Sequence, residues 1–177
     1  MAWTAPATWL AGSTLTAAQL NEQVRDNTSY LYSPQMAKVR LTSDFGAPYV
    51  STTAITWQAD SAPGFDTGGM WASGDATKMI PTVAGVYVFT LSCQWTYTGT
   101  MSTSAARILL NSNVIGRQAV FAAQTTELDY SVSVVTNMNG TTDFVTADLF
   151  YSGTPTFVTL KAVEATYLSG HYIGPTP

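Results

Sequence analysis

The sequence predicts a mainly β protein, an antiparallel β-sandwich preceded by one short N-terminal α-helix and an extended arm. Two observations carry this prediction. Apolar and polar residues alternate in GVYVFTLSCQWTY (85–97) and again in ELDYSVSVVT (127–136), and period-two alternation is typical of strands with one buried face. Glycine, proline and asparagine separate these runs at short, even intervals, which favours antiparallel connections.

Three parts follow one another along the 177 residues: an arm over residues 1–12, a helix over roughly 14–31 and a β-region over roughly 37–172. The chain is long enough for one compact domain with its own core plus an appendage. We therefore divide it into an N-terminal anchoring segment, residues 1–36, and a β-domain, residues 37–177.

The predicted helix has a marked start and end. Thr16 and Gln19 fit a capping box, in which each side chain bonds the backbone N–H of the other residue. Pro34 biases the residue before it away from helical angles. A single narrow stripe of the helix is formed by Ala17, Leu20, Val24, Asn27 and Leu31. Isolated helices of about 15 residues are marginal in water, so this helix is expected to need a partner surface.

The clearest strand of the β-region is predicted over residues 85–97. One face of that strand holds Tyr87, Phe89, Leu91, Cys93, Trp95 and Tyr97. Residues 106–110 and 114–121, joined by NSN, form a hairpin candidate. The strand over 127–136 leads to Asn139-Gly140, which suits a tight hairpin, so TDFVTADLFY (142–151) is expected to pair with it. SGTP (152–155) is then expected to turn the chain into residues 156–168.

Composition narrows the possible partners. Charged residues make up 10% of the chain, against about 25% in a typical soluble domain, which favours self-association. The net charge is −4 and the seven Lys and Arg are scattered, so nucleic acid is not an expected partner. No apolar run approaches the length of about 18 residues that spans a bilayer, and the first residues do not form a secretory signal. We expect synthesis in a cytoplasm and no membrane insertion.

No catalytic, cofactor or metal site is predicted. His171 is the only histidine and is interpreted as a surface or interface residue. Cys93 lies on the apolar face of the clearest strand and is interpreted as a buried hydrophobe. Asp66 is interpreted as a turn residue rather than a calcium ligand. Asp143 and Asp148 have odd separation, which places them on opposite faces and argues against a glycosidase pair.

Several aromatic residues are candidates for sugar stacking: Trp57, Trp71, Trp95 and Tyr97. Core filling is the first interpretation for Trp95, because its strand face is apolar. Trp71 lies in the glycine-rich loop GGMWASGD and is the candidate for a surface ligand contact.

Two segments resemble a known jelly roll. Phe65-Asp66 followed by Pro81, Gly85 and Tyr87, with Phe89 after them, resembles the first half of complement-globular-head and tumour-necrosis-factor-like domains. TYLSGHYI (166–173) is similar to the aromatic-rich last strand of those domains. The turn with Asp66, Thr67, Gly69 and Met70 is similar to a phage-encoded version. No Gly-x-y repeat precedes the domain, unlike in the collagen-linked members.

The N-terminal segment resembles a different group, the N-termini of bacteriophage structural proteins, particularly tail-associated ones. The residues that carry this resemblance are Trp9, Gly12, Leu15, Thr16, Ala17, Leu20, Asn21, Arg25, Asp26, Asn27 and Leu31. Trp3 and Trp9 lie in an arm with no local core, and each can bury on the order of 150–250 Å². Docking of this arm into another chain is therefore favoured.

Together the resemblances imply a non-enzymatic virion protein, a homotrimeric jelly roll attached to other virion proteins. The anchoring candidates are Trp3, Trp9, Leu15, Leu20, Val24, Arg25 and Leu31. The trimer-interface candidates are Tyr87, Tyr151, Tyr167 and Tyr172. A minor tail or tail-fibre protein is the first interpretation. The alternatives are a capsid decoration (head fibre) trimer and a module that binds a host cell-surface glycan or receptor.

Overall fold

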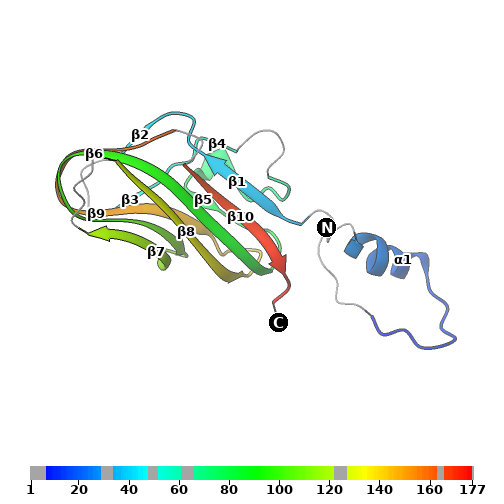
Figure 1. Cartoon of the computed structure of the whole chain (residues 1–177). Coiled ribbons are helices and arrows are strands. Elements are labelled where there is room, and N and C mark those ends of the chain that lie inside the picture. The colour runs from blue at the N-terminus through cyan, green and yellow to red at the C-terminus, as the bar shows by residue number, and fades with distance from the viewer. Residues whose placement is uncertain are drawn as a thin grey trace. The chain divides into compact units, whose positions relative to one another are not determined.

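The computed structural model of the protein describes residues 7–28, 34–47, 52–60, 66–121, 127–162 and 166–176. Backbone packing divides the chain into an N-terminal unit that ends at Pro34 and a β-domain over Gln35–Thr176. Figure 1 shows a short helix in the first unit and a mainly antiparallel β-sandwich in the second. The predicted fold class is confirmed.

The helix is less regular than predicted. The α-helix α1 covers Ala17–Leu20, a π-helix, η1, continues it over Asn21–Asp26, and residues 27–28 are α-helical again. A π-helix closes its hydrogen bonds from i to i+5, so side chains four positions apart no longer lie directly above one another. The single stripe predicted for an α-helix over 14–31 is therefore wrong, and Leu31 lies outside the described residues.

The β-domain contains ten strands and one 3-10 helix, η2 (Ser73–Asp75). The strands are β1 (Met36–Arg40), β2 (Phe45–Ala47), β3 (Thr52–Ala54), β4 (Ala59–Asp60), β5 (Lys78–Met79), β6 (Gly85–Leu110), β7 (Asn113–Phe121), β8 (Glu127–Met138), β9 (Val145–Leu160) and β10 (Tyr167–Gly174).

The strands form two layers that share the long strand β6 (Figure 1). In the first layer, β10 and β8 flank the N-terminal half of β6, and β1 and then β4 follow outside β10. In the second layer, β9 and β7 flank the C-terminal half of β6, and β2, β3 and β5 pair with β9. All described pairs are antiparallel, as the sequence predicts.

Two bulges explain how β6 serves both layers. The pairing of β6 with β9 shifts between Thr98 and Gly99 and again between Met101 and Thr103. An extra residue in one strand bends it and changes which side chains face inward. Odd-numbered residues are buried up to Tyr97, whereas Ser104, Ala106 and Ile108 are buried beyond the bulges. The sequence pattern ended the strand at residue 97 because alternation stops where β6 turns from one layer into the other.

One predicted hairpin is confirmed and one is wrong. β6 pairs with β7 through a tight turn at Asn111 and Ser112, which have φ of 48° and 70°. β8 instead pairs with β6 and not with β9, because the loop after β8 carries the chain across to the other layer. The turn predicted at 152–155 is also wrong. β9 continues through it, and Gly153, with φ of 115°, lies at the bend opposite Met101.

The core lies between the layers and is rich in large side chains. Trp57, Trp95, Tyr87 and Phe89 are among those fully buried. Trp95 contacts Tyr130 edge-on, with ring centroids 5.4 Å apart. Burial of such rings is the main source of stability for a chain that has a single cysteine and hence no internal disulfide.

A polar cluster around Gln35 joins the start of β1 to two loops. The Gln35 side chain donates to the Gly68 carbonyl at 3.1 Å and to the Thr82 hydroxyl at 2.6 Å. It accepts from the Thr82 backbone N–H at 3.2 Å and from the Tyr87 hydroxyl at 2.5 Å. Because Gln35 is buried, these bonds satisfy polar groups that water does not reach.

Candidate functional site

The N-terminal unit presents a capped helix whose apolar side chains are exposed, although the polar Asn27 near its end is buried. The Thr16 backbone N–H donates to Gln19 Oε1 at 2.9 Å, and the Gln19 backbone N–H donates to the Thr16 hydroxyl at 3.2 Å. The predicted capping box is therefore confirmed. Neither α1 nor η1 contains a buried residue, and Leu20 and Val24 are 43% and 51% exposed. A helix that begins with a proper cap but covers no core has its apolar side chains free for another surface.

The other anchoring candidates divide into three groups. Trp9 and its neighbour Leu10 are exposed, and Leu15 is half-buried. Arg25 is exposed and its Nε donates to Asp26 Oδ1 at 2.7 Å, which raises the pKa of the guanidinium. Trp3 and Leu31 lie outside the described residues.

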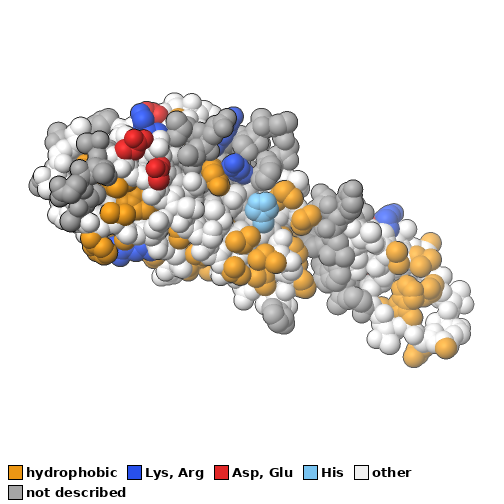
Figure 2. Space-filling view, in the orientation of Figure 1, with side chains coloured by type: hydrophobic (Ala, Val, Ile, Leu, Met, Phe, Trp, Pro, Cys, Tyr) orange, Lys and Arg blue, Asp and Glu red, His pale blue; other side chains and the backbone are white. Residues whose placement is uncertain are grey.

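The outer face of the first layer has an apolar end. Met36, His171, Val88 and Val135 lie directly opposite one another across β1, β10, β6 and β8, and opposed residues share a face. Val135 is 66% exposed, and Ile173, near this row, is 57% exposed. Figure 2 shows hydrophobic side chains beside the single histidine of the chain, His171.

The next rows of the same face are polar. Lys38, Ser169, Thr90 and Ser133 form the row beside His171, and the Thr90 and Ser133 hydroxyls are 2.8 Å apart. An apolar end beside a hydroxyl-rich surface is the arrangement of an interface core and its polar rim.

The four tyrosines predicted at a trimer interface separate into two pairs. Tyr87 and Tyr151 are buried in the core of their own subunit, which corrects the expectation that their side chains contact a partner. Their rings fill the space between the layers because both face inward. Tyr167 and Tyr172 are half-buried. Tyr172 meets Tyr87 edge-on, with centroids 5.2 Å apart.

The aromatic residues considered for sugar stacking lie mainly inside the domain. Trp57, Trp95 and Tyr97 are buried, so their rings are not available to a sugar. Trp71 is half-buried against the core, and its indole N–H donates to the Ala76 carbonyl at 3.3 Å. Asp66 accepts backbone N–H bonds from Met70 and Trp71 at 2.8 and 3.1 Å, which is the turn role predicted for it.

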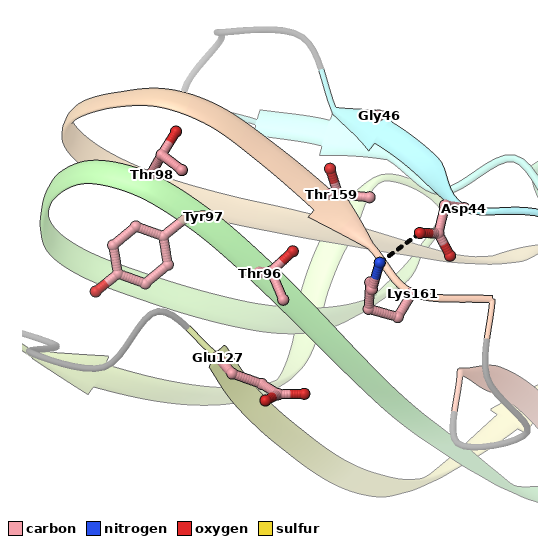
Figure 3. Close-up of a pocket in the computed structure, with 8 residues that line it drawn as sticks. All are labelled: Asp44, Gly46, Thr96, Tyr97, Thr98, Glu127, Thr159 and Lys161. Atoms are coloured by element: carbon pink, nitrogen blue, oxygen red, sulfur yellow. Dashed lines mark hydrogen bonds and ion pairs between the residues drawn. The ribbon is translucent and has the colours of Figure 1, made fainter.

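A surface pocket of about 610 Å³ lies where β2, β6, β8 and β9 come together. Figure 3 shows the ion pair of Lys161 and Asp44 at its edge, with Glu127 contributed from β8. The Lys161 ammonium lies 2.5 Å from Asp44 Oδ2, and Asp44 Oδ1 accepts from the Ala162 N–H at 2.8 Å. These bonds lower the pKa of Asp44. The lysine is thus held as the partner of a carboxylate.

The described residues offer little for catalysis. Burial raises the pKa of the Cys93 thiol to about 12, so it is not a thiolate at neutral pH. Asp148 receives two bonds from Arg107, at 2.6 and 2.5 Å. Within the described parts of the chain, no three His, Cys, Asp or Glu residues gather as a metal site. No helix in those parts has the length and hydrophobicity to cross a membrane.

The fold matches two kinds of solved structure. Murine APRIL at pH 5.0 gives a TM-score of 0.55 with 12% identity, over 78% of this chain and 98% of APRIL. The globular domain of zebrafish complement 1qA protein gives 0.56 with 17% identity, over 80% of this chain and 99% of that domain. The β-domain is a jelly roll. It has the tumour-necrosis-factor and complement-head form that the sequence resembles, so that predicted fold is confirmed.

Sequence comparison adds no assignment to this jelly roll. No protein-family description matches the chain, and no curated protein matches it. At identities this low, the structural likeness identifies the fold alone, because one fold hosts many functions.

Proposed function

We propose that this protein is a non-enzymatic structural protein of a bacteriophage virion. In this proposal the jelly roll forms a homotrimer displayed on the particle, and the N-terminal arm and helix attach it to a neighbouring virion protein. The observation that carries the proposal is the capped helix that, over its described residues, buries no apolar side chain. A short helix of this kind is marginal in water, and its exposed Leu20 and Val24 suit docking on another chain.

The trimer is supported by the first layer of the jelly roll. Exposed Val135 and Ile173 lie at the apolar end of its outer face, and association would remove this apolar surface from water. Obligate interfaces commonly bury more than about 2,000 Å². The low content of charged residues, 10%, fits a surface that self-associates.

A minor tail or tail-fibre protein is the first choice of location, because the segment from Trp9 to Leu31 resembles the N-termini of tail-associated phage proteins. A capsid decoration trimer would use the same anchor and the same trimer surface. Electron microscopy of particles that carry a labelled version of this protein separates the two locations. A label on the head would contradict the tail assignment and leave the anchoring proposal in place.

Replacing the exposed apolar residues of the helix tests the anchor. We expect the Leu20→Glu, Val24→Glu double variant to fold normally but to be missing from purified particles, because two charges are placed on the docking surface. Ala18→Glu is the control, since Ala18 is exposed on the same helix and keeps those two side chains. Deletion of residues 1–31 should likewise leave the jelly roll folded and prevent incorporation. Normal incorporation of the double variant or the deletion would refute the anchor.

A further inference from the structure

The outer face of the second layer carries an unusual pair of cations. Arg107 on β6 lies directly opposite Arg117 on β7, and on its other side it lies opposite Asp148 on β9. Like charges directly opposite one another destabilise a sheet. Charge pairing within the sheet therefore gives no reason for a second arginine at this position.

The carboxylate neutralises only one of the two arginines. Arg107 Nε and Nη2 donate to the two oxygens of Asp148 at 2.6 and 2.5 Å, and both side chains are largely buried. Arg117 is exposed, and no carboxylate of the described residues forms an ion pair with it. The face thus keeps one positive charge without a counter-charge.

An aromatic ring holds that charge in place. The Phe150 ring lies under both guanidinium groups, 5.2 Å from Arg107 Cζ and 5.5 Å from Arg117 Cζ. Ala105 and Ala119 are opposite Phe150 in the same row, and their small side chains leave space for the ring and the arginine to meet above β6. A cation this close to the face of an aromatic ring is attracted to it, and because Arg117 is exposed, its N–H groups remain accessible to a ligand.

The next row adds an exposed ring and two hydroxyls. Phe121, Thr103 and Ser152 lie opposite one another on β7, β6 and β9, and Phe121 is 72% exposed. Figure 2 shows a Lys or Arg side chain beside hydrophobic ones over β7. The three rows therefore offer a cation beside an aromatic ring, further aromatic surface and hydroxyl groups on one sheet face, which we name the Arg117 face.

We propose that the Arg117 face binds an acidic sugar, with the sugar carboxylate on the Arg117 guanidinium. Guanidinium and carboxylate match in charge and in bidentate geometry. A sugar ring also has an apolar face for Phe150 or Phe121 and hydroxyl groups for Thr103 and Ser152. An acidic peptide would use the charge but leave the flat arrangement of ring and hydroxyls without a purpose. The inference rests on the proposed function and deepens it, because it names a class of ligand for the domain displayed on the particle. The residues of the Arg117 face are different from those proposed for the anchor and for the trimer interface.

Titration with matched saccharides, followed by amide NMR shifts of the full chain, tests this inference. The probes are sialyllactose, which carries a carboxylate, and lactose, which does not. We expect sialyllactose to shift amides of β7 and β9 and to bind at least about tenfold more tightly than lactose, since a hydrogen bond to a charged group is worth about 1.5–3 kcal/mol. Trigalacturonic acid, a carboxylated saccharide of different shape, is expected to compete for the same face.

Arg117→Ala should weaken sialyllactose binding at least about tenfold, and Arg117→Lys should weaken it too, because an ammonium lacks the planar fork. Lys38→Ala is the matched control. Lys38 also lies over a ring, that of Tyr167 at 4.0 Å, but on the first layer, so this variant removes the same charge and should bind as the unaltered chain does. Equal binding of lactose and sialyllactose, unchanged binding by Arg117→Ala, or binding of a poly-glutamate peptide but of no acidic sugar would each overturn the proposal. The proposed function is tested separately, by the oligomeric state of the protein and its incorporation into particles, and none of these binding results would contradict it.

Discussion

At the scale of single residues, Gln35 shows how a polar side chain can organise an apolar fold. It lies at the first position of the β-domain and connects two loops to Tyr87. Gly68 is adapted to it, because a Cβ at that position would lie 2.1 Å from Gln35 Nε2. The side chain, the glycine and the two loops therefore form one interdependent unit.

We predict that Gln35→Ala lowers the free energy of unfolding by about 1–3 kcal/mol, because it leaves buried partners without their hydrogen bonds. Gln58→Ala is the matched control. Gln58 is exposed and accepts from backbone N–H groups of Thr42 and Ser43 at 2.7 Å, which water can replace. Urea unfolding measures the free energy of unfolding of both variants. An equal loss in the two would show that the burial of Gln35 does not account for its contribution to stability.

Burial of titratable groups predicts a loss of stability in alkali. Burial raises the pKa of Cys93 to about 12 and also raises the pKa values of Tyr87 and Tyr130. Above the ordinary pKa of these groups, the unfolded chain releases protons that the folded chain retains. The free energy of unfolding should thus be steady near neutral pH and fall as the pH rises from about 9 toward 12.

The free energy of unfolding, measured at a series of pH values, checks this prediction. In the Cys93→Ala variant it should fall less steeply with pH, because one of the three titrating groups is removed. An identical slope in Cys93→Ala would contradict the assignment to the thiol.

At the scale of elements, the turn between β6 and β7 holds residual strain. Asn111 and Ser112 both adopt positive φ, as tight hairpin turns of this kind require. Asn111 compensates, because its side chain bonds Asp143 at 2.8 Å and the Phe144 N–H at 3.0 Å. Ser112 has the conformation that glycine adopts most easily.

Ser112→Gly should therefore raise the free energy of unfolding by about 0.5–1 kcal/mol. Asn113→Gly, one position later, should lower it, since Asn113 begins β7 and does not have positive φ. Thermal unfolding of the two variants measures both signs. If both substitutions stabilised the protein, the positive φ of Ser112 would not be the reason for the stabilisation by Ser112→Gly.

The same elements show what the sequence could and could not predict. Period-two alternation located β6 and β8 because each has one face on the core. It missed the second half of β6 because bulges exchange the inward and outward positions there. Asn139-Gly140 is typical of a hairpin turn, yet β8 pairs with β6, whose partner residues lie 31–53 positions away in the sequence. Local residues signal that the chain turns but do not say into which layer it goes.

Candidate surfaces were harder to predict than strands, for a related reason. Tyr87 and Tyr151 are predicted at the trimer interface because they are tyrosines, but their burial depends on which layer covers them in the fold. The Arg117 face was missed because Arg107, Arg117 and Phe150 come from three strands. A sequence signal did exist in the arginine at position 117 within an otherwise uncharged strand, NVIGRQAVF.

At the scale of the whole molecule, the account depends on the jelly roll being a subunit of a trimer. Val135 and Ile173 expose apolar surface at one end of the first layer. A monomer would leave this surface in water, where it favours association. The helix in the N-terminal unit is a separate feature, proposed to act on a different partner.

Native mass spectrometry of the purified full chain at micromolar concentration tests the central claim most directly. The account predicts a species of three times 18.9 kDa, which Val135→Glu converts to monomer because a charge is placed in the apolar interface. Val114→Glu, on the exposed β7 of the other layer, should leave the trimer intact. A monomer of the unaltered chain, or a trimer that Val135→Glu does not affect, would contradict the account.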